Sequence, residues 1–173
     1  MSLLRTAVSR ALPRRAFSTS AERKAGTLYI CGTGEYCKLG LSDKNDRETP
    51  TLVEALAEVP VVLAACGKYH SAALSASGDV YAWGLESNGQ LGLGSYKTKA
   101  HTPQKVEALS GVGVTDISCG MYHTLALTEA GEVYSCGYGG SLFGGAGGLG
   151  LGNRTQQDTP QKIETFGLLR PTS

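Results

Sequence analysis

Residues 66–81 of the chain read CGKYHSAALSASGDVY, and residues 119–134 read CGMYHTLALTEAGEVY. The two stretches align without a gap and begin 53 residues apart. Each holds a short strand-like run, a glycine where a tight hairpin would turn, and a second run that returns through Val-Tyr. Self-similarity at one spacing of about 50 residues indicates a repeat architecture.

Three shorter blocks recur in the same order beyond this pair. They are an apolar block that ends in Gly (28–32, 80–84 and 133–137), a Leu-Gly-Leu block (39–41, 91–93 and 149–151) and a Thr-Pro pair (49–50, 102–103 and 159–160). The last unit carries a Gly-rich insertion around 140–148. Residues 26–163 therefore divide into three units, 26–60, 61–110 and 111–163.

The units predict strands and very little helix. The expected strands cover 61–65, 70–75 and 80–84 in the second unit and 114–118, 123–128 and 133–137 in the third. The pieces that contain Pro103 and Pro160 suit outer strands, because proline cannot donate to a central ladder. Only residues 54–58 look weakly helical. Three to four strands in each unit of about 50 residues predict an all-β fold built of propeller blades.

Four motifs follow one another in the second unit: Cys-Gly-x-x-His-(Ser/Thr)-x-Ala-Leu, Gly-x-Val-Tyr-x-(Trp/Cys)-Gly, Asn-Gly-Gln-Leu-Gly-Leu-Gly and Thr-Pro. All but the Asn-Gly-Gln of the third motif recur in the third unit. This set resembles the repeat of the regulator of chromosome condensation family, most specifically over residues 66–137. The first unit departs from the pattern, since 35–38 read EYCK where 87–90 read SNGQ. The resemblance implies RCC-type β-propeller blades, which in that family form a ring of seven.

The number of blades leaves three alternatives open. The chain holds about three partial units, whereas propellers typically close with four to eight blades. It is a fragment of a larger propeller, a chain that self-assembles or joins partners in a ring, or an open arc with exposed strand edges. Residues 164–173 are expected to be a truncated or disordered tail.

The N-terminal residues have the composition of a targeting leader. Residues 1–24 hold six basic residues and one acidic residue, whereas the rest of the chain holds ten basic and 14 acidic ones and is net −4. An amphipathic, Arg-rich stretch without acids is typical of an organelle transit peptide. Arg15 to Ser18 resembles a mitochondrial processing site. We expect 1–25 to be a disordered mitochondrial transit peptide; the alternatives are a plastid leader or a basic tail that contacts RNA or lipid.

Recurrence at equivalent positions favours a structural role for the chemically prominent residues. A catalytic residue rarely recurs in each blade, whereas a residue that holds the blade together should recur. No hydroxyl or acid lies at a triad spacing from a histidine, and His101 is expected in a solvated loop. We therefore predict no catalytic residue and assign a structural repeat role to Cys66, Gly67, His70, Gly78, Trp83, Gly84, Cys119, Gly120, His123, Gly131 and Gly137.

Cysteines and glycine loops give no support to a metal or a cofactor. Cys31 and Cys136 share the repeat position of Trp83, so cysteine fills an apolar slot there. Cys37 lies outside any shared strand position, and no C-x-x-C exists. Residues 145–150 satisfy G-x-G-x-x-G but lack the following helix that a dinucleotide site needs. We expect neither cofactor nor metal, and Tyr29, Tyr81 and Tyr134 are expected in the core.

The expected function is that of a non-catalytic protein-interaction module in the mitochondrial matrix. The net charge of +1 gives no global argument for nucleic acid, and no apolar run is long enough to span a membrane. Loops are the usual place of binding; the candidates are Asn88, Lys97, Lys99, Ser141 and Phe143. The resemblance implies two alternatives: an exchange factor for an organellar small GTPase, or a scaffold associated with mitochondrial ribosomal particles or RNA.

Overall fold

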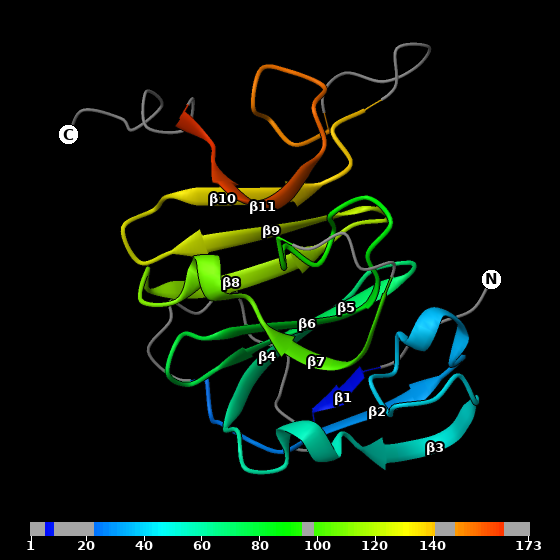
Figure 1. The fold of residues 1–173 in the computed structure, drawn as a ribbon. Helices are drawn as coiled ribbons and strands as arrows, with labels where there is room; N and C mark the ends of the chain where they lie inside the picture. Colours follow the sequence, from blue (N-terminus) through cyan, green and yellow to red (C-terminus); the bar gives the residue numbers. More distant parts are fainter. Residues whose placement is uncertain (1–5, 9–22, 95–98, 141–147, 165–173) are drawn as a thin grey trace.

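The computed structural model describes residues 6–8, 23–94, 99–140 and 148–164, whose strands form three antiparallel sheets that follow one another as blades (Figure 1). The first sheet contains β1 (Thr6–Val8), β2 (Leu28–Gly32) and β3 (Arg47–Leu52). The second contains β4 (Val61–Cys66), β5 (His70–Ser75), β6 (Val80–Leu85) and β7 (Lys99–Lys105). The third contains β8 (Val114–Cys119), β9 (His123–Thr128), β10 (Val133–Gly137) and β11 (Gln157–Lys162).

The second and third sheets have the same meander topology, in which each strand pairs with its neighbours in sequence. The hairpin between β5 and β6 turns at Gly78, whose φ of +84° lies in the left-handed region. Gly84 also has a positive φ, +109°, and a Cβ there would in addition lie 2.6 Å from the carbonyl oxygen of Tyr69. The prediction of an all-β fold with outer strands that carry Pro103 and Pro160 is confirmed.

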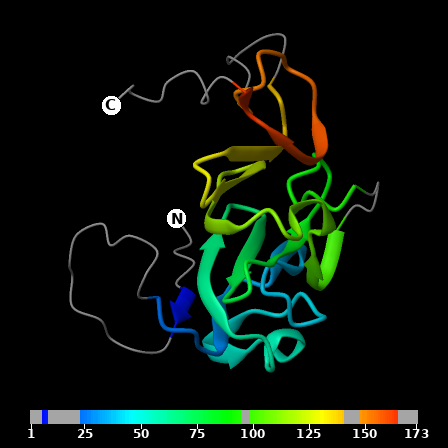
Figure 2. The ribbon, with the colours of Figure 1, turned by 90° about the vertical axis from the view of Figure 1, so that its left-hand side faces the viewer.

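The core lies between neighbouring sheets, so each blade buries the face of the one before it. Leu74 on β5 is 2% exposed because β8 of the third sheet packs against it. The equivalent residue on β9, Leu127, is 40% exposed. Seen from the side in Figure 2, the blue-to-cyan, green and yellow-to-red blades succeed one another along the chain. The same repeat position is thus buried or exposed according to whether another blade covers it.

Three short 3₁₀ helices complete the described elements: η2 (Glu35–Cys37), η3 (Glu54–Leu56) and η4 (Glu107–Leu109). The weak helical pattern at 54–58 corresponds to η3, whereas η4 occupies the same place in the second unit and was missed. Both end on a buried leucine, Leu56 or Leu109, that anchors the connection between two blades. None of the helices in the described ranges is long and apolar enough to span a membrane.

Part of the segment expected to be a disordered leader has regular structure. Thr6–Val8 forms β1 and pairs antiparallel with β2. Arg23 donates hydrogen bonds to the carbonyl of Thr115 and to the carboxylate of Asp116, both at 3.0 Å, so the end of this segment is joined to the third blade. The predicted tail lies outside the described residues from 165 onward.

Candidate functional site

The first histidine of the repeat joins two blades. His70 on β5 is fully buried, and its Nε2 lies 2.8 Å from Thr124 Oγ1 on β9 of the next blade. Thr124 Oγ1 donates its only proton to the carbonyl oxygen of Gln90 at 2.7 Å. The hydroxyl can therefore only accept from the ring, so His70 carries its proton on Nε2. We refer to the arrangement of His70, Thr124 and Gln90 as the blade clasp.

The blade clasp is a neutral, structural arrangement. Burial, with a smaller effect from His123, lowers the pKa of His70 to about 4. The imidazole is therefore uncharged near neutral pH and donates through Nε2, while Nδ1 has no hydrogen-bond partner in the described part of the chain. The ring also packs on Gly67, where an added Cβ would lie 2.7 Å from His70 Cε1. Among the described residues, the one hydrogen-bond contact of this ring is the Thr124 hydroxyl, whose own proton is donated to Gln90.

The joint between the first and second blades uses the equivalent main-chain acceptor, the carbonyl of Lys38 in place of that of Gln90. Ser71, which precedes Thr124 by one repeat, donates to the carbonyl of Lys38 at 2.8 Å. Trp83 Nε1 donates to the same carbonyl at 2.9 Å, and Cys136 Sγ lies 3.8 Å from the carbonyl of Gln90. The sequence analysis singled out the histidines and Trp83 but missed these hydroxyls, although a Ser or Thr follows each histidine.

His123 repeats the position of His70 but lies on the uncovered face of the third blade. Its side chain is half-buried, and its ring has no hydrogen-bond partner among the residues that the structure describes. Gly120 packs against this ring as Gly67 packs against His70. Both histidines therefore pack against the glycine three residues before them, and only His70 joins two described blades.

All five cysteines lie within the described residues, and none of them forms a disulfide there. Burial raises the pKa of Cys119 to about 12 and raises that of Cys136 as well, so neither is a reactive thiolate. Cys37 has a φ of 63° and stands where the second unit has Gly89. Its Sγ lies 3.3 Å from His101 Nδ1. His101 is exposed, as expected, but it lies in β7, which begins at Lys99, and not in a loop.

Glu86 is a buried acid that the sequence analysis did not single out. Burial raises its pKa to about 7, and Leu91 N–H donates to its Oε2. Its repeat equivalents are Gly34 and Gly139, so no recurring signal marked it. Within the described residues, no group of three His, Cys, Asp or Glu side chains has the arrangement of a metal site. Glu86 is therefore a buried acid with Asp158 and Cys136 as titratable neighbours, and not part of a described metal site.

Four tyrosines form a contiguous row across the three blades. Tyr69 and Tyr122 lie in the turns before β5 and β9, and their rings stack with centroids 5.2 Å apart and planes 25° apart. Tyr36 of η2 meets Tyr69 at 5.2 Å and 85°, and Tyr138 after β10 meets Tyr122 at 6.2 Å and 68°. Lys68 Nζ lies 5.0 Å from the centroid of the Tyr69 ring. We call these five residues the tyrosine row.

The tyrosine row was missed because sequence reasoning considered only the strand tyrosines. Tyr81 and Tyr134 do pack against the core. Tyr69 and Tyr122, by contrast, share a turn position in the Cys-Gly-x-Tyr-His motif. Turns at one repeat position lie side by side when blades succeed one another, as the hydrogen bond from Lys68 N to the carbonyl of Gly120 shows. The shared position was the signal that could have revealed the row.

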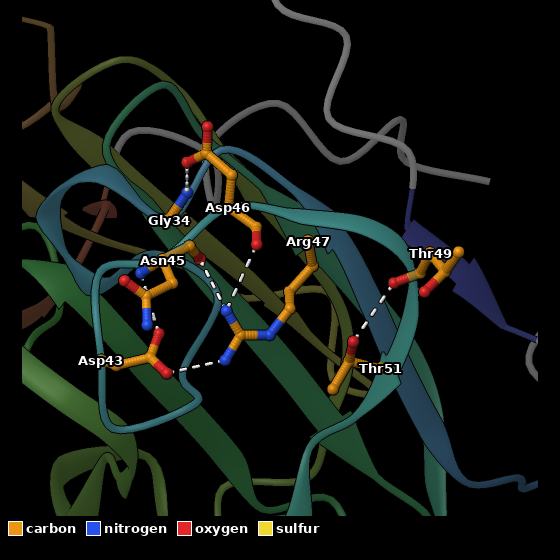
Figure 3. A network of polar contacts seen from close by, with 7 residues as sticks. All are labelled: Gly34, Asp43, Asn45, Asp46, Arg47, Thr49 and Thr51. Carbon is orange, nitrogen blue, oxygen red and sulfur yellow. Dashed lines mark hydrogen bonds and ion pairs between the residues drawn. The ribbon is translucent and has the colours of Figure 1, made fainter.

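A polar network in the first blade holds the end of the row in place (Figure 3). Asp46 accepts a hydrogen bond from Gly34 N at 2.9 Å, directly before η2 and Tyr36. Arg47 in turn pairs with Asp43 at 2.6 Å and donates to the carbonyls of Asn45 and Asp46. Hydrogen bonding to Arg47 is the main cause that lowers the pKa of Asp43. Hydrogen bonds and an ion pair thus hold the loop after η2 together and join it to the backbone of Gly34, two residues before Tyr36.

The predicted partner loops do not coincide with the row. Asn88 is half-buried, and its backbone N–H donates to Gln90 Oε1 at 2.8 Å. Lys99 lies at the start of β7 and is also half-buried. Lys97, Ser141 and Phe143 lie outside the described residues. The described members therefore occupy two separate elements, and neither contributes to the tyrosine row.

Comparison with known sequences identifies the repeat. Two family models of the "Regulator of chromosome condensation (RCC1) repeat" match the chain. The first matches residues 25–74 and 77–127, and the second matches residues 61–90 and 114–141. The chain is 36% identical over 140 residues to "Ultraviolet-B receptor UVR8" of Arabidopsis thaliana, an alignment that covers 81% of this chain and 30% of that protein. It is 38% identical over 155 residues to "RCC1 domain-containing protein RUG3, mitochondrial" of the same plant, covering 86% and 33%.

The solved structures give the same result. Prp20p of Saccharomyces cerevisiae superposes with a TM-score of 0.69 at 27% identity, over 82% of this chain and 35% of that one. The chain spans about a third of the length of these relatives, and its three sheets match part of an RCC1 propeller, which confirms the predicted partial propeller. Because the first family model alone matches more than half of the residues of the chain, the chain belongs to the regulator of chromosome condensation (RCC1) repeat family.

Proposed function

We propose that the chain is a non-catalytic protein-interaction module of the mitochondrion. The observation that carries the proposal is the tyrosine row, which crosses three blades at one end of the strands. Tyrosine and methionine are enriched at protein interfaces and tyrosine at their energetic centres. Met121, in the same turn as Tyr122, is 44% exposed, and Tyr138 is 39% exposed. A rigid row of large, partly exposed side chains suits recognition of another protein.

The non-catalytic part of the proposal is supported by how the titratable groups are used. His70 is engaged in the blade clasp, Cys119 and Cys136 are held as thiols by burial, and buried Glu86 accepts a hydrogen bond from Leu91 N–H. A general base needs a proton donor or acceptor within hydrogen-bond reach of a substrate. Cys37 Sγ and His101 Nδ1 lie 3.3 Å apart, but the Cys37 side chain is fully buried, so this described pair is not open to a substrate.

The mitochondrial part is supported by the acid-free, Arg-rich leader and by the likeness to a relative whose name includes "mitochondrial". The test is import of the radiolabelled full chain into isolated mitochondria. We expect a protease-protected product that is shorter by about the length of the leader and requires a membrane potential. Substitution of Arg14 and Arg15 by Ala should block processing. A product that remains accessible to protease would overturn the localisation.

Photo-crosslinking tests the interaction surface in the same organelles. A benzophenone amino acid replaces Met121, and the matched control replaces Ser110, an exposed residue that precedes β8 where Met121 follows it. We expect discrete protein adducts from position 121 that disappear when Tyr69 and Tyr122 are both changed to Ala. Equal adducts from both positions, or none from position 121, would contradict the proposed surface.

Exchange activity towards a small GTPase is a second candidate. The crystal structure of Prp20p was described together with the binding of that protein to Gsp1p and histones, and its propeller is similar to these blades. Exchange requires that binding energy stabilise the nucleotide-free GTPase. The assay is release of a fluorescent GDP analogue from purified mitochondrial GTPases. Faster release in proportion to added chain would support the candidate, and unchanged release across the set would remove it.

A further inference from the structure

The first sheet contains a strand of the leader at the place where the other two sheets have their histidine-bearing strand. β2, β6 and β10 are equivalent strands of the three units, and β5 and β9 pair with β6 and β10 along one edge. Along the same edge of β2 lies β1. β1 also lies against β4 of the second blade, as β5 lies against β8 of the third. We call this place beside β2 the inner-strand site.

The register of β1 in the inner-strand site is the register of the repeat. Residues 6–8 read TAV, residues 72–74 of β5 read AAL, and residues 125–127 of β9 read LAL. In each case the middle alanine is the partner of the tyrosine in the adjacent strand; the pairs are Ala7 with Tyr29, Ala73 with Tyr81 and Ala126 with Tyr134. The leader therefore places an x-Ala-(Val/Leu) segment exactly as the repeat does.

β1 covers less of this edge than an inner strand of the repeat. The register of β5 along β6 continues to Gly84, whereas that of β1 along β2 stops at Ile30. No strand of the described residues pairs with the other edge of β1, whereas β4 and β8 pair with β5 and β9. A short strand that is paired on one side only opens at a low cost in free energy. β1 is therefore an exchangeable occupant of the site.

The position of β2 is fixed by contacts that do not involve β1. Leu28 and Ile30 are each 1% exposed, and Gly26 exchanges two backbone hydrogen bonds with Val61 of β4, at 2.8 and 3.0 Å. The processing site expected within residues 15–18 follows β1 in the sequence and precedes all four of these residues. Removal of the leader would therefore take β1 away and leave β2 in place, with its edge towards the inner-strand site uncovered.

The neighbouring residues define the kind of segment that fits the site. β2 itself has no charged residue. The partners of Leu28 and Ile30 stand at the places of Leu74 and Ala72, which are 2% and 0% exposed in the second blade, and the alanine between them is also 0% exposed. An open sheet edge binds an extended segment through main-chain hydrogen bonds and selects it through alternate side chains. The site therefore suits an uncharged x-Ala-Leu segment.

A processed second copy of the chain has no such segment to donate. Its two described strands with this pattern, β5 and β9, are each paired on both sides within their own sheets. The segment must then come from a different protein.

We propose that removal of the leader opens the inner-strand site to an extended x-Ala-Leu segment of a partner protein, which pairs antiparallel with β2. The inference rests on the proposed function, because it requires a leader that is removed, and it adds a contact separate from the tyrosine row. β1 holds the site closed in the unprocessed chain. Since an open strand edge invites aggregation, the same strand protects the chain until it has been imported.

Fluorescence anisotropy of a labelled peptide measures access to the site. The probe has the sequence of residues 67–76, GKYHSAALSA, and the control peptide has proline at the place of Ala73, because proline cannot continue a central ladder. In the full chain, Ala7→Pro prevents β1 from pairing. This variant should bind the probe at least about tenfold more tightly than the native chain, in which the site is open only in a small fraction of molecules. The proline peptide should bind at least about tenfold more weakly than the probe.

Two further proteins control for the substitution itself. Ala16→Pro introduces proline into the leader outside β1 and should bind the probe as weakly as the native chain does. The full chain cleaved in vitro by the matrix processing peptidase presents the open site without any substitution and should match Ala7→Pro. Circular dichroism and the fluorescence of Trp83 verify that each protein is folded.

Three results would overturn the inference. They are equal affinity of the probe for the native chain and for Ala7→Pro, equal affinity of the probe and the proline peptide for Ala7→Pro, and self-association of Ala7→Pro in sedimentation, which would make a second copy the occupant. Import and the adducts from position 121 are measured independently. A chain that is imported and forms these adducts, but whose Ala7→Pro variant does not bind the probe, would keep the proposed function and reject only the strand site.

Discussion

Replacing Thr124 by valine should weaken the contact between the second and third blades without changing the shape of either blade. Valine keeps the volume and branching of threonine but removes the hydroxyl at the centre of the blade clasp. Two hydrogen bonds are lost, at 2.8 Å to His70 Nε2 and at 2.7 Å to the carbonyl of Gln90. Both groups are buried, and His70 is then left without a partner at either ring nitrogen.

The expected cost follows from the two groups that lose their partner. A buried polar group without a hydrogen bond costs about 1–3 kcal/mol. The carbonyl of Gln90 keeps only the weak contact at 3.8 Å from Cys136 Sγ. We therefore expect Thr124→Val to lower the free energy of unfolding by about 2–4 kcal/mol. For a chain of this size that corresponds to a fall of roughly 5–15 °C in the melting temperature.

Urea unfolding measured by two probes is the suitable assay. Circular dichroism follows all three sheets, whereas fluorescence of Trp83, the single tryptophan, follows the joint between the first and second blades. Thr124→Ser is the matched control because it retains the hydroxyl and introduces the residue found at the equivalent Ser71. Loss of one methyl group should cost only about 0.8 kcal/mol. Equal stabilities of Thr124→Val and Thr124→Ser would refute the role assigned to the blade clasp.

Three further perturbations have defined outcomes. The folded state lowers the pKa of His70 from its ordinary 6.5 to about 4. The free energy of unfolding should therefore fall by about 3 kcal/mol as pH falls from 6.5 to 4. In His70→Gln, the free energy of unfolding measured across this pH range should not show that fall. Glu86 has a folded pKa of about 7, above its ordinary 4.5, so its contribution is present below pH 4.5 and lost as pH rises through 7; Glu86→Gln should remove that slope and be more stable than the native chain at pH 8. Trp83→Phe removes one of two donors to the Lys38 carbonyl, which Ser71 still bonds. Calorimetry should therefore show a loss of about 0.5–1.5 kcal/mol for this hydrogen bond, and an unchanged melting temperature would contradict the contact.

The strands were predictable because period-two patterns and hairpin glycines are local. The expected strand at 70–75 coincides with β5, and β4 and β8 each extend one residue further than expected, to Cys66 and Cys119. β7 was expected only from Pro103 and begins at Lys99 instead. A proline in an outer strand leaves no ladder bond unsatisfied, so the residues before it can pair with β6. The Thr-Pro pair therefore marks the middle of this strand and not its start.

The contacts between blades were less predictable, because they depend on how separate units lie against one another. The repeat identified His70, but its partner Thr124 belongs to the next unit, and the final acceptor is the main-chain carbonyl of Gln90. A main-chain acceptor leaves no mark in the sequence. The stacking of Tyr69 on Tyr122 likewise requires neighbouring turns to lie side by side. Glu86 has no repeat counterpart, so comparison of the units could not single it out.

Each of the two joints between described blades uses one main-chain carbonyl as the acceptor for side chains of the next blade, and we call this oxygen the carbonyl socket. The donors are side chains, Ser71 with Trp83 in one joint and Thr124 with Cys136 in the next, but the socket is the peptide oxygen of Lys38 or of Gln90. Any residue type supplies that oxygen, so at this contact only the donor constrains side-chain identity, whereas the contact of His70 with Thr124 constrains both blades. An exchanged blade would keep the carbonyl contact only if it brought its own hydroxyl.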